Sequence, residues 1–111
     1  MAEDMDKETK TKISRLQVLE QRIQSLMMQK QTFQSQTLET ENALGEIGDA
    51  KETYKIVGNV MVSVDKAELK KNLTSKKEMA DLKLKNIEKE EKKLREEAEE
   101  LQKDVMGSLK K

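Results

Sequence analysis

The hydrophobic residues of this chain recur in two long segments, at intervals that alternate between three and four residues. The repeating positions of the first segment, residues 9–48, are Leu16, Leu19, Ile23, Leu26, Lys30, Phe33, Thr37, Thr40, Leu44 and Ile47. Those of the second segment, residues 66–106, are Leu73, Lys77, Ala80, Leu84, Ile87, Glu91, Leu94, Ala98, Leu101 and Val105. Such intervals are the a and d positions of a heptad repeat, which form one narrow seam along a helix. The chain is therefore predicted to be mainly α, with two long helices that pair through these seam positions.

The ends of both predicted helices carry residues that favour helix boundaries. Gly48 and Gly107 stand near the ends of the two repeats, and glycine is common where a helix stops. Asp65 precedes the second helix and can cap its free N–H groups, while Glu68 is placed to bond back to it. The chain contains no proline, so nothing forces a break within either helix. We therefore expect helices over about residues 9–48 and 66–106.

Residues 53–64, between the helices, have the pattern of a β-hairpin. Two short β-branched or alternating runs flank Gly58-Asn59, a pair suited to a tight primed turn. Such a turn places Val57 opposite Val60 and Ile56 opposite Met61. One face of the ribbon then carries Val57, Val60, Val62 and Val64, and the other carries Tyr54, Ile56 and Met61.

This hairpin is predicted to be an assembly surface. Both of its faces are apolar, both edges have unpaired backbone groups, and an isolated two-stranded hairpin is marginal in water. Alternatively, the hairpin could fold down onto its own helices, but that would cover one face and leave the other face and both edges open. We therefore expect pairing with strands of other copies or other subunits, for example in a closed intersubunit β-barrel.

Because a hairpin reverses the chain, the two helices are expected to run antiparallel. Counting outward from the turn places Leu19 near Leu94 and Leu26 near Ile87. In the same register Lys30 would lie along Leu84, with its aliphatic stem over the seam and its ammonium group in water.

The composition agrees with a thin helical structure and argues against several functions. Charged residues make up 40% of the 111 residues and hydrophobic residues 34%, too little to enclose a thick core. Histidine, cysteine and a glycine-rich phosphate loop are absent, so we expect no enzyme activity, no metal site and no cofactor. The 22 basic and 22 acidic residues balance, and only two residues are aromatic, so neither nucleic acid nor a membrane is an expected partner. Without an apolar leader or spanning segment, the expected location is the cytoplasm.

The stretch TYKIVGNVMVSVDKAEL, residues 53–69, resembles the linker of the β subunits of archaeal prefoldin. The residues that match this linker are Tyr54, Lys55, Val57, Gly58 and Asn59, followed by the apolar run up to Val64. The resemblance extends over the architecture of the whole chain, residues 1–111, as a single prefoldin-type subunit. It implies a hexamer of two α-type and four β-type subunits whose hairpins form β-barrels. It also implies ATP-independent capture of unfolded polypeptides and their delivery to a group II chaperonin.

If the free ends of the helices bind such clients, the contacts are expected to be apolar and shared among several subunits. The candidates near these ends are Met5, Ile13, Leu16, Leu101, Val105, Met106 and Leu109. Seam residues among them are more often plain packing residues, whereas Met106 and Leu109 lie off the seam. A structural coiled-coil scaffold without chaperone activity would use the same helices and hairpin, and is the alternative function.

Overall fold

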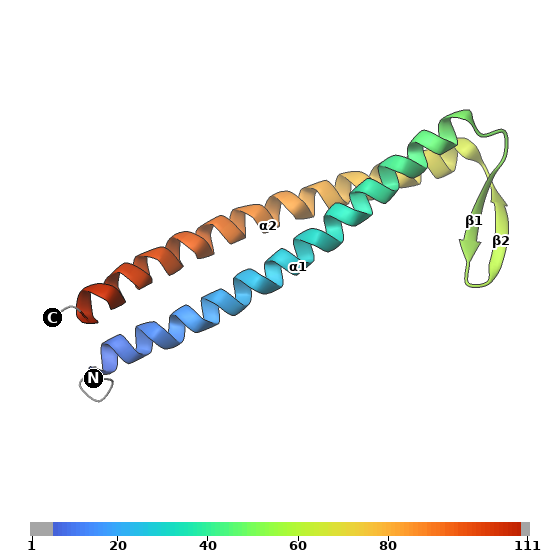
Figure 1. The fold of residues 1–111 in the computed structure, drawn as a ribbon. Helices are drawn as coiled ribbons and strands as arrows, with labels where there is room; N and C mark the ends of the chain where they lie inside the picture. The colour runs from blue at the N-terminus through green and yellow to red at the C-terminus, as the bar shows by residue number, and fades with distance from the viewer. Residues whose placement is uncertain (1–5, 110–111) are drawn as a thin grey trace. The chain divides into compact units, whose positions relative to one another are not determined.

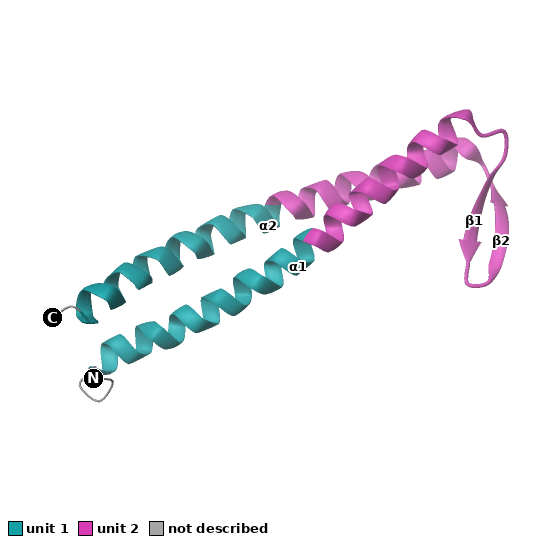
Figure 2. Cartoon of the chain, viewed as in Figure 1, with its two compact units in different colours: residues 1–30, 86–111 teal, residues 31–85 magenta. Residues whose placement is uncertain are grey.

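The computed structural model describes residues 6–109, which form two long helices joined by one antiparallel hairpin. The elements are, in chain order, α1 (Lys7–Asp49), β1 (Thr53–Val57), β2 (Val60–Val64) and α2 (Lys66–Leu109) (Figure 1). This is the predicted fold class. The chain divides into two compact units: the first contains α1 up to Lys30 and α2 from Asn86 onward, and the second contains residues 31–85 with the hairpin (Figure 2).

The helices extend somewhat beyond the predicted bounds. Helix α1 begins two residues earlier and ends one residue later than expected, and α2 ends three residues later. Gly48 and Gly107 consequently lie inside the helices, so Gly107 does not act as the predicted stop. A helical glycine costs only about 1 kcal/mol relative to alanine, which a helix supported by a partner can tolerate.

Both helices begin at an aspartate that caps the first turn. The backbone N–H of Thr9 donates to Asp6 Oδ1 at 2.7 Å, so Asp6 is a cap that the sequence reading did not assign. At α2, the predicted cap is present: Glu68 N–H donates to Asp65 Oδ2 at 3.4 Å. No reverse bond from the Glu68 side chain is found among residues 6–109, so only half of the predicted capping box forms.

The seam of the first unit is buried as predicted. Leu19 is completely buried, and Ile23, Leu26, Ile87 and Leu94 are each less than a tenth exposed. Two ion pairs flank the predicted pairing of Leu19 with Leu94: Arg15 with Glu97 at 3.2 Å, and Arg22 with Glu90 at 2.9 Å. These contacts fix the antiparallel register that was expected from the sequence.

A polar layer interrupts this seam at Lys30 and Glu91. The Glu91 side chain is only 15% exposed; it forms an ion pair with Lys30 Nζ at 3.8 Å and accepts a hydrogen bond from Arg95 Nε at 3.0 Å. The Lys30 side chain is 31% exposed, so its ammonium pairs with Glu91 at an edge of the seam that solvent still reaches. A seam carboxylate with so little access to water needs cationic partners, and Lys30 is long enough to supply one.

The second unit continues the same seam with more polar residues. Ile47 and Ala80 are buried, and Lys83 Nζ lies 5.2 Å from the centre of the Phe33 ring, a cation–π contact. Lys77, on the seam of α2, pairs with Glu41 of α1 at 3.1 Å. The buried Thr37 hydroxyl finds no hydrogen-bond partner within the described residues.

We predict that Thr37→Val stabilises the chain. Valine keeps the shape of threonine and removes a buried hydroxyl that lacks a partner, which should raise the free energy of unfolding by about 1 kcal/mol. The measurement is the urea midpoint followed by circular dichroism.

Thr40→Val is the matched control, because Thr40 is also a seam residue of α1 but its hydroxyl donates to the Gln36 carbonyl at 2.7 Å. This variant loses a hydrogen bond and should gain little or nothing. An equal rise in both variants would show that the missing partner is not the cause.

Candidate functional site: an exposed apolar hairpin

The two strands are joined by the predicted two-residue turn. The register pairs Val57 with Val60, Ile56 with Met61 and Tyr54 with Ser63, all as expected. Gly58 has a φ of 61°, and no other described residue has a positive φ. Positive φ at the first central residue alone is the signature of a type II′ turn, which suits the twist of a hairpin.

The hairpin exposes a large apolar surface on both faces. Its exposed hydrophobic side chains retain between 44% and 70% of their accessible surface: they are Tyr54, Ile56, Val57, Val60, Met61 and Val62. Gly58 and Asn59 at the turn are exposed as well, whereas Val64, next to α2, is half-buried. Isolated exposed hydrophobic residues are ordinary, but a contiguous set on a strand pair is typical of an interaction site.

The base of the hairpin is held by hydrogen bonds to both helix ends. Thr53 is buried, and its hydroxyl donates to the Val64 carbonyl at 2.8 Å. Lys66 Nζ donates to the carbonyls of Gly48 and Ala50 at 3.0 and 3.1 Å. The last carbonyls of a helix have no partner within it and favour a cation. Lys66 therefore links the start of α2 to the end of α1, and these hydrogen bonds hold the base of the hairpin in place.

An open apolar hollow lies beside this base, within the second unit. Its apolar lining comes from both helices and from β1: Ala43, Ile47, Leu69, Leu73, Tyr54 and Ile56. The Tyr54 hydroxyl donates to Glu52. This hydrogen bond, and to a smaller extent desolvation, raises the pKa of Tyr54 above its usual value.

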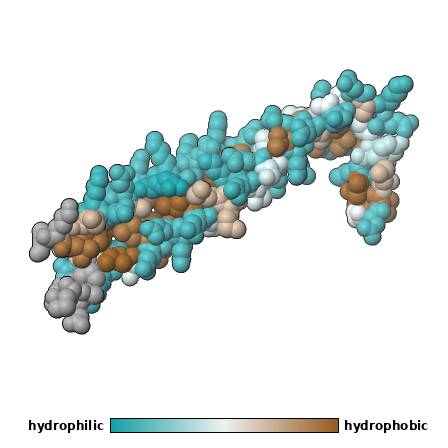
Figure 3. Space-filling model, in the orientation of Figure 1, coloured by the Kyte–Doolittle hydropathy of each residue, from teal (hydrophilic) through white to brown (hydrophobic). Residues whose placement is uncertain are grey.

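The predicted client-binding residues that the structure describes all belong to the first unit. Met106 and Leu109 are 51% and 56% exposed, in line with their off-seam positions. Val105 is buried, and the remaining seam candidates are half-buried: Ile13, Leu16 and Leu101. Met5 lies outside the described residues. Figure 3 shows hydrophobic residues gathered at the free ends of this unit, with others on the hairpin of the second unit.

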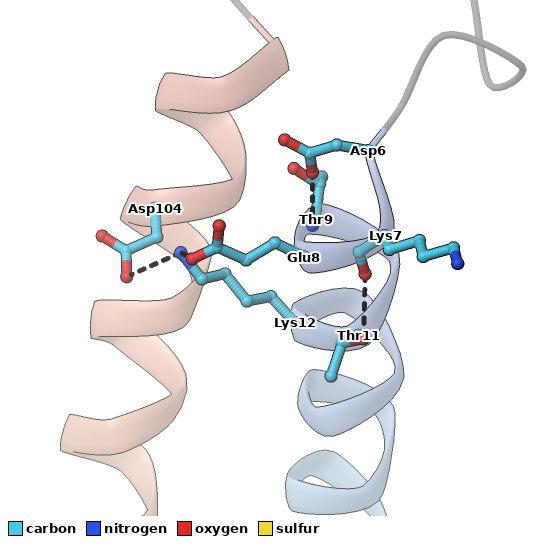
Figure 4. Close-up of polar contacts among 7 residues, drawn as sticks. All are labelled: Asp6, Lys7, Glu8, Thr9, Thr11, Lys12 and Asp104. Atoms are coloured by element: carbon cyan, nitrogen blue, oxygen red, sulfur yellow. Dashed lines mark hydrogen bonds and ion pairs between the residues drawn. The ribbon is translucent and has the colours of Figure 1, made fainter.

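The free ends of α1 and α2 are joined by polar contacts (Figure 4). Lys12 Nζ lies 3.6 Å from Glu8 of its own helix and 3.7 Å from Asp104 of α2. Hydrogen bonds from Thr9, first from its side chain and then from its backbone, lower the pKa of Asp6 and keep this cap ionised. Thr9 itself is buried, so the packing of the two helices continues to the first turn of α1.

Two further features are missing from the described residues. No group of three or more histidine, cysteine, aspartate or glutamate side chains within residues 6–109 is placed to hold a metal ion. In the same part of the chain, no helix has the length and apolar character needed to cross a membrane.

Comparison with known proteins places this architecture in a family. The family profile described as "Prefoldin subunit" matches residues 10–111. A protein named prefoldin subunit beta from Archaeoglobus fulgidus is 34% identical over 100 residues, covering 87% of this chain and 86% of the relative. Its counterpart from Saccharolobus islandicus is 32% identical over 114 residues, covering 100% and 90%. The crystal structure of the prefoldin beta subunit from Thermococcus strain KS-1 matches with a TM-score of 0.87 at 28% identity, and covers 97% of each chain.

We predict that Lys66→Met loosens the base of the hairpin. Methionine keeps the length of the side chain but cannot donate to the Gly48 and Ala50 carbonyls, which should cost about 1–2 kcal/mol locally. Amide hydrogens of residues 53–64 should then exchange roughly five to thirty times faster. Lys71→Met removes an exposed α2 lysine and should leave this exchange unchanged. Equal exchange in both variants would contradict the role assigned to Lys66.

Proposed function

The chain belongs to the prefoldin family as a β-type subunit, and from this we propose that it serves in an ATP-independent chaperone that holds unfolded polypeptides. Prefoldin subunits are chaperones rather than enzymes, and they work in complexes of several prefoldin subunits. The proposal adds the parts of the chain that perform the two tasks: assembly by the hairpin and client binding by the free ends of the helices.

The exposed hairpin is the observation that most directly supports the proposal. Its six exposed hydrophobic side chains and its unpaired strand edges are unfavourable in water, and a two-stranded ribbon is too small to be stable on its own. Pairing with hairpins of other prefoldin subunits removes both defects, because a closed barrel has no free edge. We propose that the partners are α-type subunits and further β copies, in a hexamer of two α and four β subunits.

Client binding is assigned to the free ends of α1 and α2. Met106 and Leu109 are exposed here without any unfolding of the helix pair. The flexible thioether of methionine suits partners of variable shape. Burial of apolar surface contributes about 25 cal/mol per Å², so one subunit binds weakly and several together gain by avidity. Val105, Ile13, Leu16 and Leu101 become available to a client only where the last turns of the helix pair open.

The client is proposed to pass from this complex to a group II chaperonin in the cytoplasm. The support for this step is membership of the family. An assembled scaffold that binds no unfolded protein is the competing function, since it requires the hairpin but not the apolar ends.

We predict that Val60→Asp together with Val62→Asp abolishes assembly. Both side chains lie on the valine face of the ribbon, and a carboxylate buried between strands costs several kcal/mol. The complex should fall to monomers or dimers by light scattering, with helix content by circular dichroism largely kept. Leu38→Asp with Leu82→Asp adds the same charge at helix side chains that are 59% and 58% exposed, and should leave the complex whole. An intact complex in the hairpin variant would contradict assembly through the strands.

We predict that Met106→Gln together with Leu109→Gln weakens the holding of clients. The assembled complex should need a several-fold higher ratio to a denatured client to suppress its aggregation, measured by light scattering without nucleotide. These substitutions leave the buried Val105 in place, so the helix pair keeps its packing.

The matched control is Met79→Gln with Leu82→Gln. This pair has the same residue types at the same spacing on α2, with exposures of 59% and 58% against 51% and 56% at the end of the helix. It should suppress aggregation as well as the unmodified complex. Equal loss in both variants would move client binding away from the ends, and no suppression by the unmodified complex would favour the scaffold.

A further inference from the structure

We infer that the order of charges along α1 and α2 forms a matching surface, whose fitting partner is an antiparallel helix that is likewise net basic in its first half and net acidic in its second. This surface selects the direction in which α1 pairs with another helix. The inference does not depend on the proposed chaperone function, because it concerns how the two helices recognise each other. It rests on the distribution of charges along the sequence and on the ion pairs between the helices.

Each helix reverses its charge at about the boundary between the two units. Residues 7–30 of α1 include six basic and two acidic residues, whereas residues 31–49 include four acidic and no basic residues. In α2, residues 66–85 include seven basic and three acidic residues, whereas residues 86–109 include five basic and eight acidic residues. The overall balance of charge in the chain therefore conceals four blocks of alternating sign.

The ion pairs between the helices follow this order in the first unit. Here α1 supplies the cation and α2 the carboxylate in every cross-helix pair that the described residues form. The pairs are Lys12 with Asp104, Arg15 with Glu97, Arg22 with Glu90, and Lys30 with Glu91, at distances from 2.9 to 3.8 Å. The two arginine pairs join the positions that flank an antiparallel seam, where charges govern partner choice.

The order is reversed in the second unit. Glu41 of α1 now supplies the carboxylate and Lys77 of α2 the cation, at 3.1 Å. Lys66 continues this pattern, since its ammonium bonds to carbonyls at the end of α1. The exchange of roles occurs between Lys30 and Glu41 on α1, and between Lys77 and Glu90 on α2.

Such an order penalises the wrong partners more than it rewards the right one. Individual exposed ion pairs contribute little to stability. A parallel pairing of α1 with α1 of a second copy, however, would bring the basic blocks together and the acidic blocks together. Like charges across an interface suppress wrong partners. The charge order therefore disfavours parallel pairing of like helices, and the antiparallel pairing of α1 with α2 carries no such penalty.

The test reverses charges at positions that flank the seam of the full-length chain. Thermal unfolding is then followed by circular dichroism at low salt. Arg15→Glu with Arg22→Glu places like charges opposite Glu97 and Glu90, and should lower Tm by about 4–8 °C. Adding Glu90→Arg and Glu97→Arg restores opposite charges in the reverse sense and should recover most of the loss. Should the first variant be unfolded at low salt, it should fold in 1 M NaCl, where the screening length is only about 3 Å.

The control combines the same α1 reversal with Glu96→Arg and Glu100→Arg. This variant has the same net charge as the rescued one, but neither residue pairs with α1 among the described residues. It should remain as unstable as the α1 reversal alone. Equal recovery in the control and in the rescued variant, or a loss of stability that 1 M NaCl does not reduce, would overturn the inference.

Discussion

A pair of helices can bury apolar surface only along the single seam where they meet, and the rest of this structure depends on that constraint. The seam is completed by Leu19, Leu26, Ile87 and Leu94 in the first unit, and it has no depth in which further hydrophobic residues could be placed. The ion pairs of Arg15 with Glu97 and of Arg22 with Glu90 lie at the borders of this seam, where solvent screens them. The hairpin, which joins the helices, has no second layer of the chain to cover it. The hairpin is thus exposed because the described helix pair does not cover its two faces.

The polar residues of the seam show how this arrangement gains specificity at the expense of stability. Lys30 and Glu91 occupy positions where leucine would contribute more apolar burial, and Glu91 binds Lys30 and Arg95 instead. A polar layer of this kind penalises any shift of register that would separate the charges from each other. The apolar seam positions therefore stabilise the helix pair, and the polar seam positions determine the register in which the helices pair.

Much of the fold was accessible from the sequence, because each element has a local signal. The heptad intervals predicted both helices, and Gly58-Asn59 predicted the turn and register of the hairpin. The base of the hairpin was not predicted: a lysine at the start of a helix gives no sign that it will reach the preceding helix end, as Lys66 does. The Asp6 cap was missed although the aspartate directly precedes the helix, and the pairing of Lys30 was missed because Glu91 was considered only as a seam position of the second helix. The client-binding residues stay a prediction, since exposure of Met106 and Leu109 is a property that many surfaces share.

Hydrogen bonds join the two ends of the hairpin where it meets the helices. Lys66 bonds to the end of α1, and Thr53 bonds to Val64. The end of the ribbon, residues 57–63, lies beyond both these hydrogen bonds and the hollow that Tyr54 and Ile56 share with the helices. The end of the ribbon could therefore change in length or sequence while the helices stay as they are. Such changes would alter the exposed apolar surface of the ribbon without redesign of the coiled coil.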